Sequence, residues 1–278
     1  MKANPADSGA RQALLRLLID QNRFDEAVDL TEASLRYTPT DANLLVDRGL
    51  LALRRGHADQ AVASWDEALA VDPDQSLARL FLADELDREG KAQTAALHYN
   101  AFLERIARQP AQDRPAPDRI IAIVLRMADC QARSSQTELA VQSYHLAEKL
   151  AVQTRQSKLE SVAEVNEAAL QAKAGKLTAA LQLYQQALQL DTALGDNSAS
   201  AADWLVYGRF LDDAGFPLRL AYACIVKSEN ITRSRPDAAA SDSLAAARKQ
   251  MEKRLGAQAA PVRRDPEPAV REALALRH

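Results

Sequence analysis

A recurring pair of residues constrains this sequence more than any other feature. An alanine or a similar residue is followed four positions later by a larger side chain, which in most copies is aromatic. The pairs are Ala27/Thr31, Ala61/Trp65, Ala95/Tyr99, Ala140/Tyr144 and Ala180/Tyr184, with a degenerate Leu220/Cys224. Successive copies are 34, 34, 45, 40 and 40 residues apart. Because self-similarity at such a period is the signature of a repeat architecture, we expect a stack of similar structural units.

Each copy also carries a small residue and a turn residue at constant distances from the pair. The small residue lies twelve positions before the first member of the pair, as Gly49, Ala83, Ala128, Ala168 and Gly208, with Leu15 as the exception. The turn residue lies five positions before it, as Asn22, Gly56, Gly90, Ser135, Gly175 and Gly215. Glycine readily adopts the left-handed conformation that ends a helix. The pattern therefore predicts two antiparallel helices per unit, joined by a tight turn.

The composition agrees with an all-α fold. Only 9 of the 278 residues are glycine, and aromatic residues make up 5% of the chain. Alanine and leucine, which are strong helix formers, are abundant. A hydrophobic fraction of 47% is enough for a sizeable core and argues against intrinsic disorder. No stretch of the sequence approaches the roughly 18 consecutive apolar residues that a membrane-spanning helix needs.

These spacings resemble the tetratricopeptide repeat. In the second unit, Gly49, Ala61, Trp65, Ala68 and Pro73 fall where that family has glycine, alanine, an aromatic residue, alanine and proline. The fifth unit matches nearly as well, with Ala168, Gly175, Ala180, Tyr184 and Ala187. The resemblance covers residues 8–235 and implies a right-handed α-solenoid of about six helix pairs with a C-terminal capping helix.

Changes in the spacing divide the array. We expect three 34-residue repeats over residues 8–109 and three longer repeats of about 40 residues over 119–236. Residues 110–118 contain three prolines and predict a linker or loop, since a helix cannot continue through them. The longer spacing predicts extended helices at 146–159 and 181–194. We expect a capping helix at 237–256, and then a flexible tail at 257–278 that contains a short amphipathic helix with Val270, Leu274 and Leu276.

Patterns typical of catalysis, cofactors or metal ions are absent from the sequence. It contains no glycine-rich phosphate loop, no CxxC and no HExxH. His57, His98, His145 and His278 are scattered along the chain, and we interpret them as ordinary surface or packing residues. Cys130 and Cys224 are interpreted as buried structural thiols, with a redox pair as the alternative. We therefore predict no catalytic, cofactor-binding or metal-binding residues and no enzymatic activity, with an enzyme or small-ligand sensor as the alternative.

The resemblance implies a partner-binding groove, because the first helices of stacked tetratricopeptide units line a concave surface. The register predicts that the groove is lined by Gln12, Arg16, Asn43, Val46, Leu50, Leu80, Asp84, Asp129, Val165 and Arg209. Gln12, Leu80 and Phe81 stand where chaperone-binding members have much of a carboxylate clamp, so no such clamp is expected. Val46, Leu50 and Leu80 favour an apolar peptide or an amphipathic helix. Alternatively, these three side chains only complete the packing between repeats.

We expect a non-catalytic scaffold or adaptor that binds a peptide or helix of a partner protein in this groove. The alternative is a permanent structural subunit or assembly factor of a larger complex, including a membrane-associated one. Self-association is compatible with both. The net charge of −3 gives no reason to expect nucleic acid as a partner. The first residues lack a signal-peptide pattern, so a cytoplasmic location is expected, or a periplasmic or membrane-anchored one if a signal or anchor has been removed.

Overall fold

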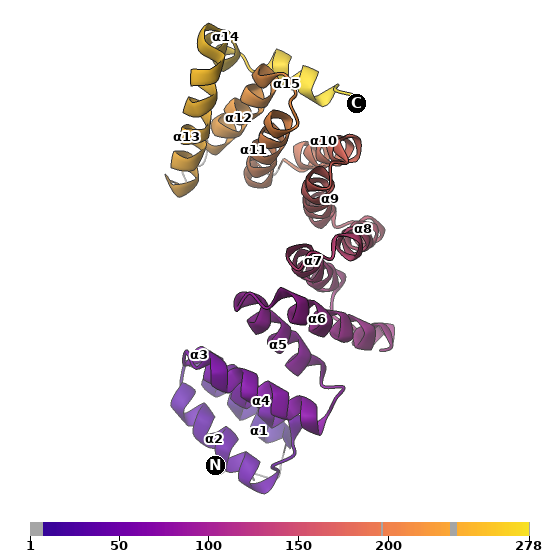
Figure 1. Ribbon diagram of the computed structural model, residues 1–278. Helices are drawn as coiled ribbons and strands as arrows, with labels where there is room; N and C mark the ends of the chain where they lie inside the picture. The colour runs from indigo at the N-terminus through magenta and orange to yellow at the C-terminus, as the bar shows by residue number, and fades with distance from the viewer. Residues whose placement is uncertain (1–7, 196, 234–237, 278) are drawn as a thin grey trace. The chain divides into compact units, whose positions relative to one another are not determined.

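The computed structural model describes residues 8–195, 197–233 and 238–277, and these contain helices and no strand (Figure 1). The chain forms two compact units, Met1–Pro115 and Ala116–His278. In each unit, helices that follow one another through short turns pack together in pairs. The prediction of an all-α fold built from successive helix pairs is therefore confirmed.

The described residues of the first unit form three helix pairs. Their bounds are α1 Ser8–Asp20, α2 Phe24–Tyr37, α3 Ala42–Arg54, α4 Ala58–Val71, α5 Ser76–Arg88 and α6 Ala92–Ala107. The recurring pairs of the sequence lie in the second helix of each pair. Ala61, Trp65, Ala95 and Tyr99 are completely buried there. Close packing of the two helices therefore depends on alanine on one turn and a large ring on the next.

The predicted proline-rich linker follows α6. It contains a short 3-10 helix, η1 (Ala111–Asp113), and ends where α7 begins at Pro117. Proline suits that position because the first residues of a helix have no intrahelical acceptor for their N–H groups. The side chain of Arg114 donates hydrogen bonds of 2.8 Å to the carbonyl oxygens of Ala107 and Gln109. These bonds tie the start of the linker to the end of α6.

The second unit continues the same arrangement with longer helices. Their bounds are α7 Pro117–Arg133, α8 Thr137–Thr154, α9 Ser157–Lys173, α10 Leu177–Leu194, α11 Asn197–Asp213 and α12 Leu218–Arg233. The capping helix, α13 (Ala238–Leu255), packs against α12. The prediction of one extended helix over 146–159 is wrong, because Arg155 adopts a left-handed conformation (φ 58°) and ends α8 before Ser157 begins the next helix.

The turns within the pairs are where the sequence pattern places them. All six predicted turn residues, Asn22, Gly56, Gly90, Ser135, Gly175 and Gly215, have positive φ angles between 56° and 84°. After Gly56, the N–H of His57 donates to the carbonyl oxygen of Ala52 at 2.9 Å, a backbone bond that closes the end of α3. Asn22 and Ser135 occupy the same conformation without the advantage of glycine, at a cost of about 1 kcal/mol each.

The C-terminal segment differs from the prediction of a flexible tail. It forms α14 (Ala259–Arg264) and α15 (Glu267–Leu274), and α15 packs on α12 with Val270 and Ala273 fully buried. Arg219 of α12 makes a two-point ion pair with Glu272, with both N···O distances 2.6 Å. The predicted short helix therefore exists, but it is docked on the rest of the unit. Its apolar face packs against α12, and its Glu272 pairs with Arg219 of α12.

Candidate functional site

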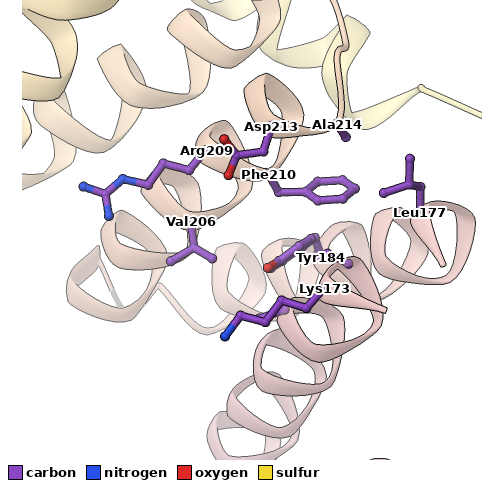
Figure 2. Close-up of a pocket in the computed structure, with 10 residues that line it drawn as sticks. Lys173, Leu177, Tyr184, Val206, Arg209, Phe210, Asp213 and Ala214 are labelled. Atoms are coloured by element: carbon purple, nitrogen blue, oxygen red, sulfur yellow. The ribbon is translucent and has the colours of Figure 1, made fainter. Parts of the chain in front are cut away.

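An open apolar pocket lies between α9, α10 and α11 of the second unit (Figure 2). Its volume is about 360 Å³. It is lined by Ala169, Ala172 and Lys173 of α9, Leu177 and Tyr184 of α10, Val206, Arg209, Phe210 and Asp213 of α11, and Ala214. The rings of Tyr184 and Phe210 have their centroids 5.1 Å apart, and Figure 2 shows them at the centre of the pocket. A cavity of this size and character suits one large apolar side chain.

The pocket arises from one change in the repeat pattern. In the fourth helix pair, the hydroxyl group of Tyr144 donates a hydrogen bond of 2.5 Å to Asp129, which lies fifteen residues earlier on the first helix. In the fifth pair the residue fifteen positions before Tyr184 is Ala169. A methyl group stands there in place of a carboxylate. The space beside Tyr184 is therefore open.

The rim of the pocket carries charge. Lys173 and Arg209 form no ion pair within the described part of the chain, and Figure 2 shows their charged ends on the same side of the pocket. Asp213 lies on the rim as well. Burial, followed by the negative charge of Asp203, raises the pKa of Tyr184 to about 12, so its hydroxyl group keeps its proton at neutral pH. The pocket thus offers apolar walls, a neutral hydroxyl group and two cations.

Comparisons with known proteins identify the fold of the chain. No protein-family model matches the sequence, and no curated protein matches it. Among solved structures, BtubC from P. vanneervenii matches with a TM-score of 0.57 and 18% identity, over 82% of this chain and 89% of that one. PilW, a widely conserved type IV pilus biogenesis factor, matches with a TM-score of 0.57 and 16% identity, over 84% of this chain and 94% of that one.

YrrB, described as a TPR protein with an unusual peptide-binding site, matches with a TM-score of 0.54 and 16% identity, over 79% of this chain and 97% of that one. The chain has the tetratricopeptide-repeat fold. The resemblance inferred from Gly49, Ala61 and Trp65 is therefore confirmed at the level of the fold.

In this tetratricopeptide-repeat array, two of the predicted groove residues are part of the core. Val46 and Leu80 are only 3% and 4% exposed, so they present no surface to a partner. The carbonyl oxygen of Val46 accepts a hydrogen bond of 3.3 Å from the indole N–H of Trp65 in the paired helix. For these two residues the groove prediction is wrong and the packing alternative holds. Leu50 lies between the two interpretations, because it is half-buried.

Two further groove residues are engaged within their own repeats. Asp84 accepts a hydrogen bond of 2.5 Å from the hydroxyl group of Tyr99, and Asp129 accepts one from Tyr144. The side-chain amide of Asn166 also lies 3.5 Å from Asp129. These aspartates hold the large ring of the second helix in place, so the structure gives them a positioning task within the repeat.

The remaining predicted residues are accessible, and one of them belongs to the pocket. Gln12, Arg16 and Asn43 are exposed on the first unit, where Asn43 accepts a hydrogen bond of 2.9 Å from Gln75. Val165 is half-buried on α9. Arg209 is exposed and lines the pocket. The accessible residues are therefore divided between the two units, and Arg209 is the one that belongs to the pocket.

Sequence reasoning missed most of the pocket itself. Tyr184 carries only the signature of its repeat, while Phe210 and Lys173 carry no signature of their own. One signal was available: Ala169 interrupts the series of aspartates at the position fifteen residues before the tyrosine. An interruption of that kind marks the place where a structural hydrogen bond is absent and a cavity can form.

The structure also brings together a cluster that could hold a metal ion. One ligand atom each from His145, Glu148 and Glu167 lie within 4.8 Å of one another. His145 and Glu148 are three residues apart on α8, while Glu167 lies on α9. His145, interpreted as an ordinary surface or packing residue, is exposed. Its position beside Glu148 and Glu167 follows from the packing of α8 on α9 and carries no signal in the sequence.

Two further expectations concern the cysteines and the membrane. Neither Cys130 nor Cys224 forms a disulfide, and both are buried, as interpreted. Burial raises the pKa of the Cys224 thiol above its ordinary value. Such thiols are poorly reactive because the thiolate is disfavoured. None of the described helices combines the length and the apolar character needed to cross a membrane.

Proposed function

We propose that this protein is a non-catalytic interaction scaffold whose second unit binds a short peptide segment of a partner protein. The observation that carries the proposal is the open pocket beside Tyr184, which exists because Ala169 stands where the two preceding repeats have aspartate. The pocket would receive one large apolar side chain of the peptide.

The charged residues on the rim of the pocket indicate which peptide sequences would bind. Lys173 and Arg209 have no ion-pair partners in the described residues, so each is free to pair with a carboxylate of a bound peptide. Exposed pairs of this kind contribute little affinity but select the orientation and the sequence of a ligand. The preferred peptide would therefore carry a leucine, methionine or aromatic residue next to an acidic residue. YrrB, which shares the fold, is described as having a peptide-binding site, and this supports a peptide as the ligand.

The test uses peptides selected against the full chain from a displayed random library. The affinity of a selected peptide is then measured by fluorescence anisotropy for the wild type, for Ala169→Asp and for Leu139→Asp. Ala169→Asp fills the pocket and offers Tyr184 the acceptor that Asp129 offers Tyr144. Leu139→Asp adds the same charge at an exposed position of α8 outside the pocket and serves as the matched control.

The expected result is enrichment of peptides with an apolar anchor and an acidic neighbour. Their affinity should fall by at least about tenfold in Ala169→Asp, since one buried large side chain is worth about 1.5–3 kcal/mol, and stay unchanged in Leu139→Asp. Equal affinity for both variants would show that the pocket is not the binding site. If selection enriches no peptide, the alternative of a permanent subunit, held through a broad surface, replaces the proposal.

A further inference from the structure

A histidine and two glutamates meet at the junction between the fourth and fifth repeats. His145 and Glu148 lie on α8, the second helix of the fourth pair, and Glu167 lies on α9, the first helix of the fifth. Nδ1 of His145 is 3.0 Å from Oε2 of Glu148. The three groups thus come from two helices that pack against each other.

A buried and unpartnered carboxylate lies next to this cluster. Glu164 is only 5% exposed, and its Oε2 atom has no hydrogen-bond partner among the described residues. Burial, followed by repulsion from Glu148, Glu160, Asp191 and Glu167, raises the pKa of Glu164 to about 8. The charged groups that perturb Glu164 are all carboxylates, from α8, α9 and α10, and no lysine or arginine is among them.

Asp191 of α10 is a second buried carboxyl group that interacts with Glu164. It is 1% exposed, and neither of its carboxylate oxygens has a hydrogen-bond partner in the described part of the chain. Buried carboxylates are normally paired with cations, bonded to donors or bound to metals, because an isolated buried charge is very costly. A proton on Glu164 would relieve only part of the repulsion. A divalent cation placed between Glu148 and Glu167 would relieve more of it.

The donor atoms indicate the kind of cation. Imidazole nitrogen with carboxylate oxygen is a ligand set that suits Zn²⁺ and other divalent transition metals, whereas Mg²⁺ and Ca²⁺ take oxygen ligands. Ligands of one zinc ion, at bond lengths of about 2.0–2.2 Å, lie at most roughly 4.4 Å apart. His145 is exposed and Glu148 is half-buried, so small side-chain movements can close the distances. Glu167 is held by Gln171, whose side-chain amide donates to Oε1 at 3.1 Å.

We propose that His145, Glu148 and Glu167 bind a divalent transition-metal ion, with Zn²⁺ the best match, and that the ion joins the fourth repeat to the fifth. Gln171 then supports the ligating carboxylate of Glu167, as outer hydrogen bonds commonly do in metal sites. Water can complete the coordination on the exposed side of His145. The site is structural, because it links two helices and lies outside the residues that line the peptide pocket.

The experiment treats the full chain with a chelator and follows the titration of ZnCl₂ by calorimetry, with MgCl₂ as the comparison. Thermal unfolding is recorded with and without each metal. One zinc ion per chain should bind and raise the unfolding temperature, while Mg²⁺ should not. His145→Ala, Glu148→Gln and Glu167→Gln should each weaken zinc binding by at least about tenfold. His57→Ala removes an exposed histidine of the first unit and should leave the affinity unchanged.

A second readout is visible absorption after titration with Co²⁺, whose d–d bands change when protein ligands replace water around the ion. The wild type should develop cobalt bands that the His145→Ala variant lacks. The proposal is overturned if the triple variant His145→Ala, Glu148→Gln, Glu167→Gln binds zinc as tightly as the wild type. It is also overturned if Mg²⁺ stabilises the chain as much as Zn²⁺ does. The carboxylates would then attract divalent cations non-specifically, without coordinating a metal ion.

Discussion

The indole ring of Trp65 occupies the space that any side chain at Gly49 would need. A Cβ atom on Gly49 would lie 2.3 Å from Nε1 and 2.7 Å from Cδ1 of Trp65. Cβ atoms in proteins essentially never lie that close to another heavy atom. Trp65 cannot move aside easily, because it is completely buried and its ring packs 5.7 Å from that of Phe81. The distance between α3 and α4 therefore depends on the absence of a side chain at residue 49.

The Gly49→Ala variant should lower the free energy of unfolding by about 2–3 kcal/mol, the usual cost of forcing an extra carbon into a packed core. Urea denaturation followed by circular dichroism measures this value. Helix propensity alone would act in the opposite direction, by about 1 kcal/mol in favour of alanine. A stabilised variant would therefore contradict the steric argument.

The matched control is the same change in a Trp65→Leu background, where the smaller side chain leaves room. In that background, Gly49→Ala should lower the free energy of unfolding by less than half as much as it does in the wild type. Equal losses in both backgrounds would mean that the clash involves another group, because neighbours in contact are expected to show non-additive effects.

The turn at Ser135 provides a second prediction. Ser135 has a φ angle of 61°, the conformation that glycine adopts at the equivalent Gly175. Ser135→Gly should raise the free energy of unfolding by about 0.5–1 kcal/mol by relieving left-handed strain. The reciprocal Gly175→Ser should lower it by a similar amount, and nothing lies within 4 Å of a Cβ there to add a steric effect. Changes of the same sign in the two variants, measured in urea, would contradict this account.

The carboxyl group of Asp47 should make stability depend on pH. Burial, followed by the negative charge of Asp41, raises the pKa of Asp47 to about 6, although Arg11 and Arg16 lower it. Between about pH 4 and pH 6 the folded chain therefore holds a proton that the unfolded chain has released. The free energy of unfolding consequently falls as the pH rises through this range.

The Asp47→Asn variant should lose that dependence and be more stable than the wild type by about 1–2 kcal/mol at pH 7. Urea denaturation at intervals from pH 4 to pH 7 gives the two profiles. Asp66→Asn, at an exposed position of α4, is the control. Its profile of unfolding free energy against pH should be parallel to that of the wild type. If the Asp47→Asn profile is parallel as well, the side chain is solvated in solution.

Docking of α15 leads to a fourth prediction. Val270 is 1% exposed on this helix, so Val270→Asp would bury a charge against α12 or release the helix. The free energy of unfolding should fall by about 3 kcal/mol, more than the value of the lost apolar contact alone. Ala275→Asp, at an exposed position just after α15, should change it by less than about 0.5 kcal/mol. Equal and small effects of the two variants would mean that the segment is free in solution.

The local features of this fold could be predicted from the sequence because each depends on residues of one repeat. Gly56 and Ser135 end helices through their own backbone conformation, and Ala61 with Trp65 packs against the helix next to it in the chain. A period in the sequence is enough to locate such features. The helix pairs, their turns and the buried cysteines follow from it.

Tertiary structure decided the features that depend on more than one repeat. Whether Val46 is exposed depends on what the neighbouring helices place over it, and the pocket beside Ala169 needs side chains from α9, α10 and α11 together. The ion pair between Arg219 and Glu272 joins residues 53 positions apart. The spacing of residues along the chain does not predict such contacts, because burial and ion pairing depend on which surfaces meet after the repeats have stacked.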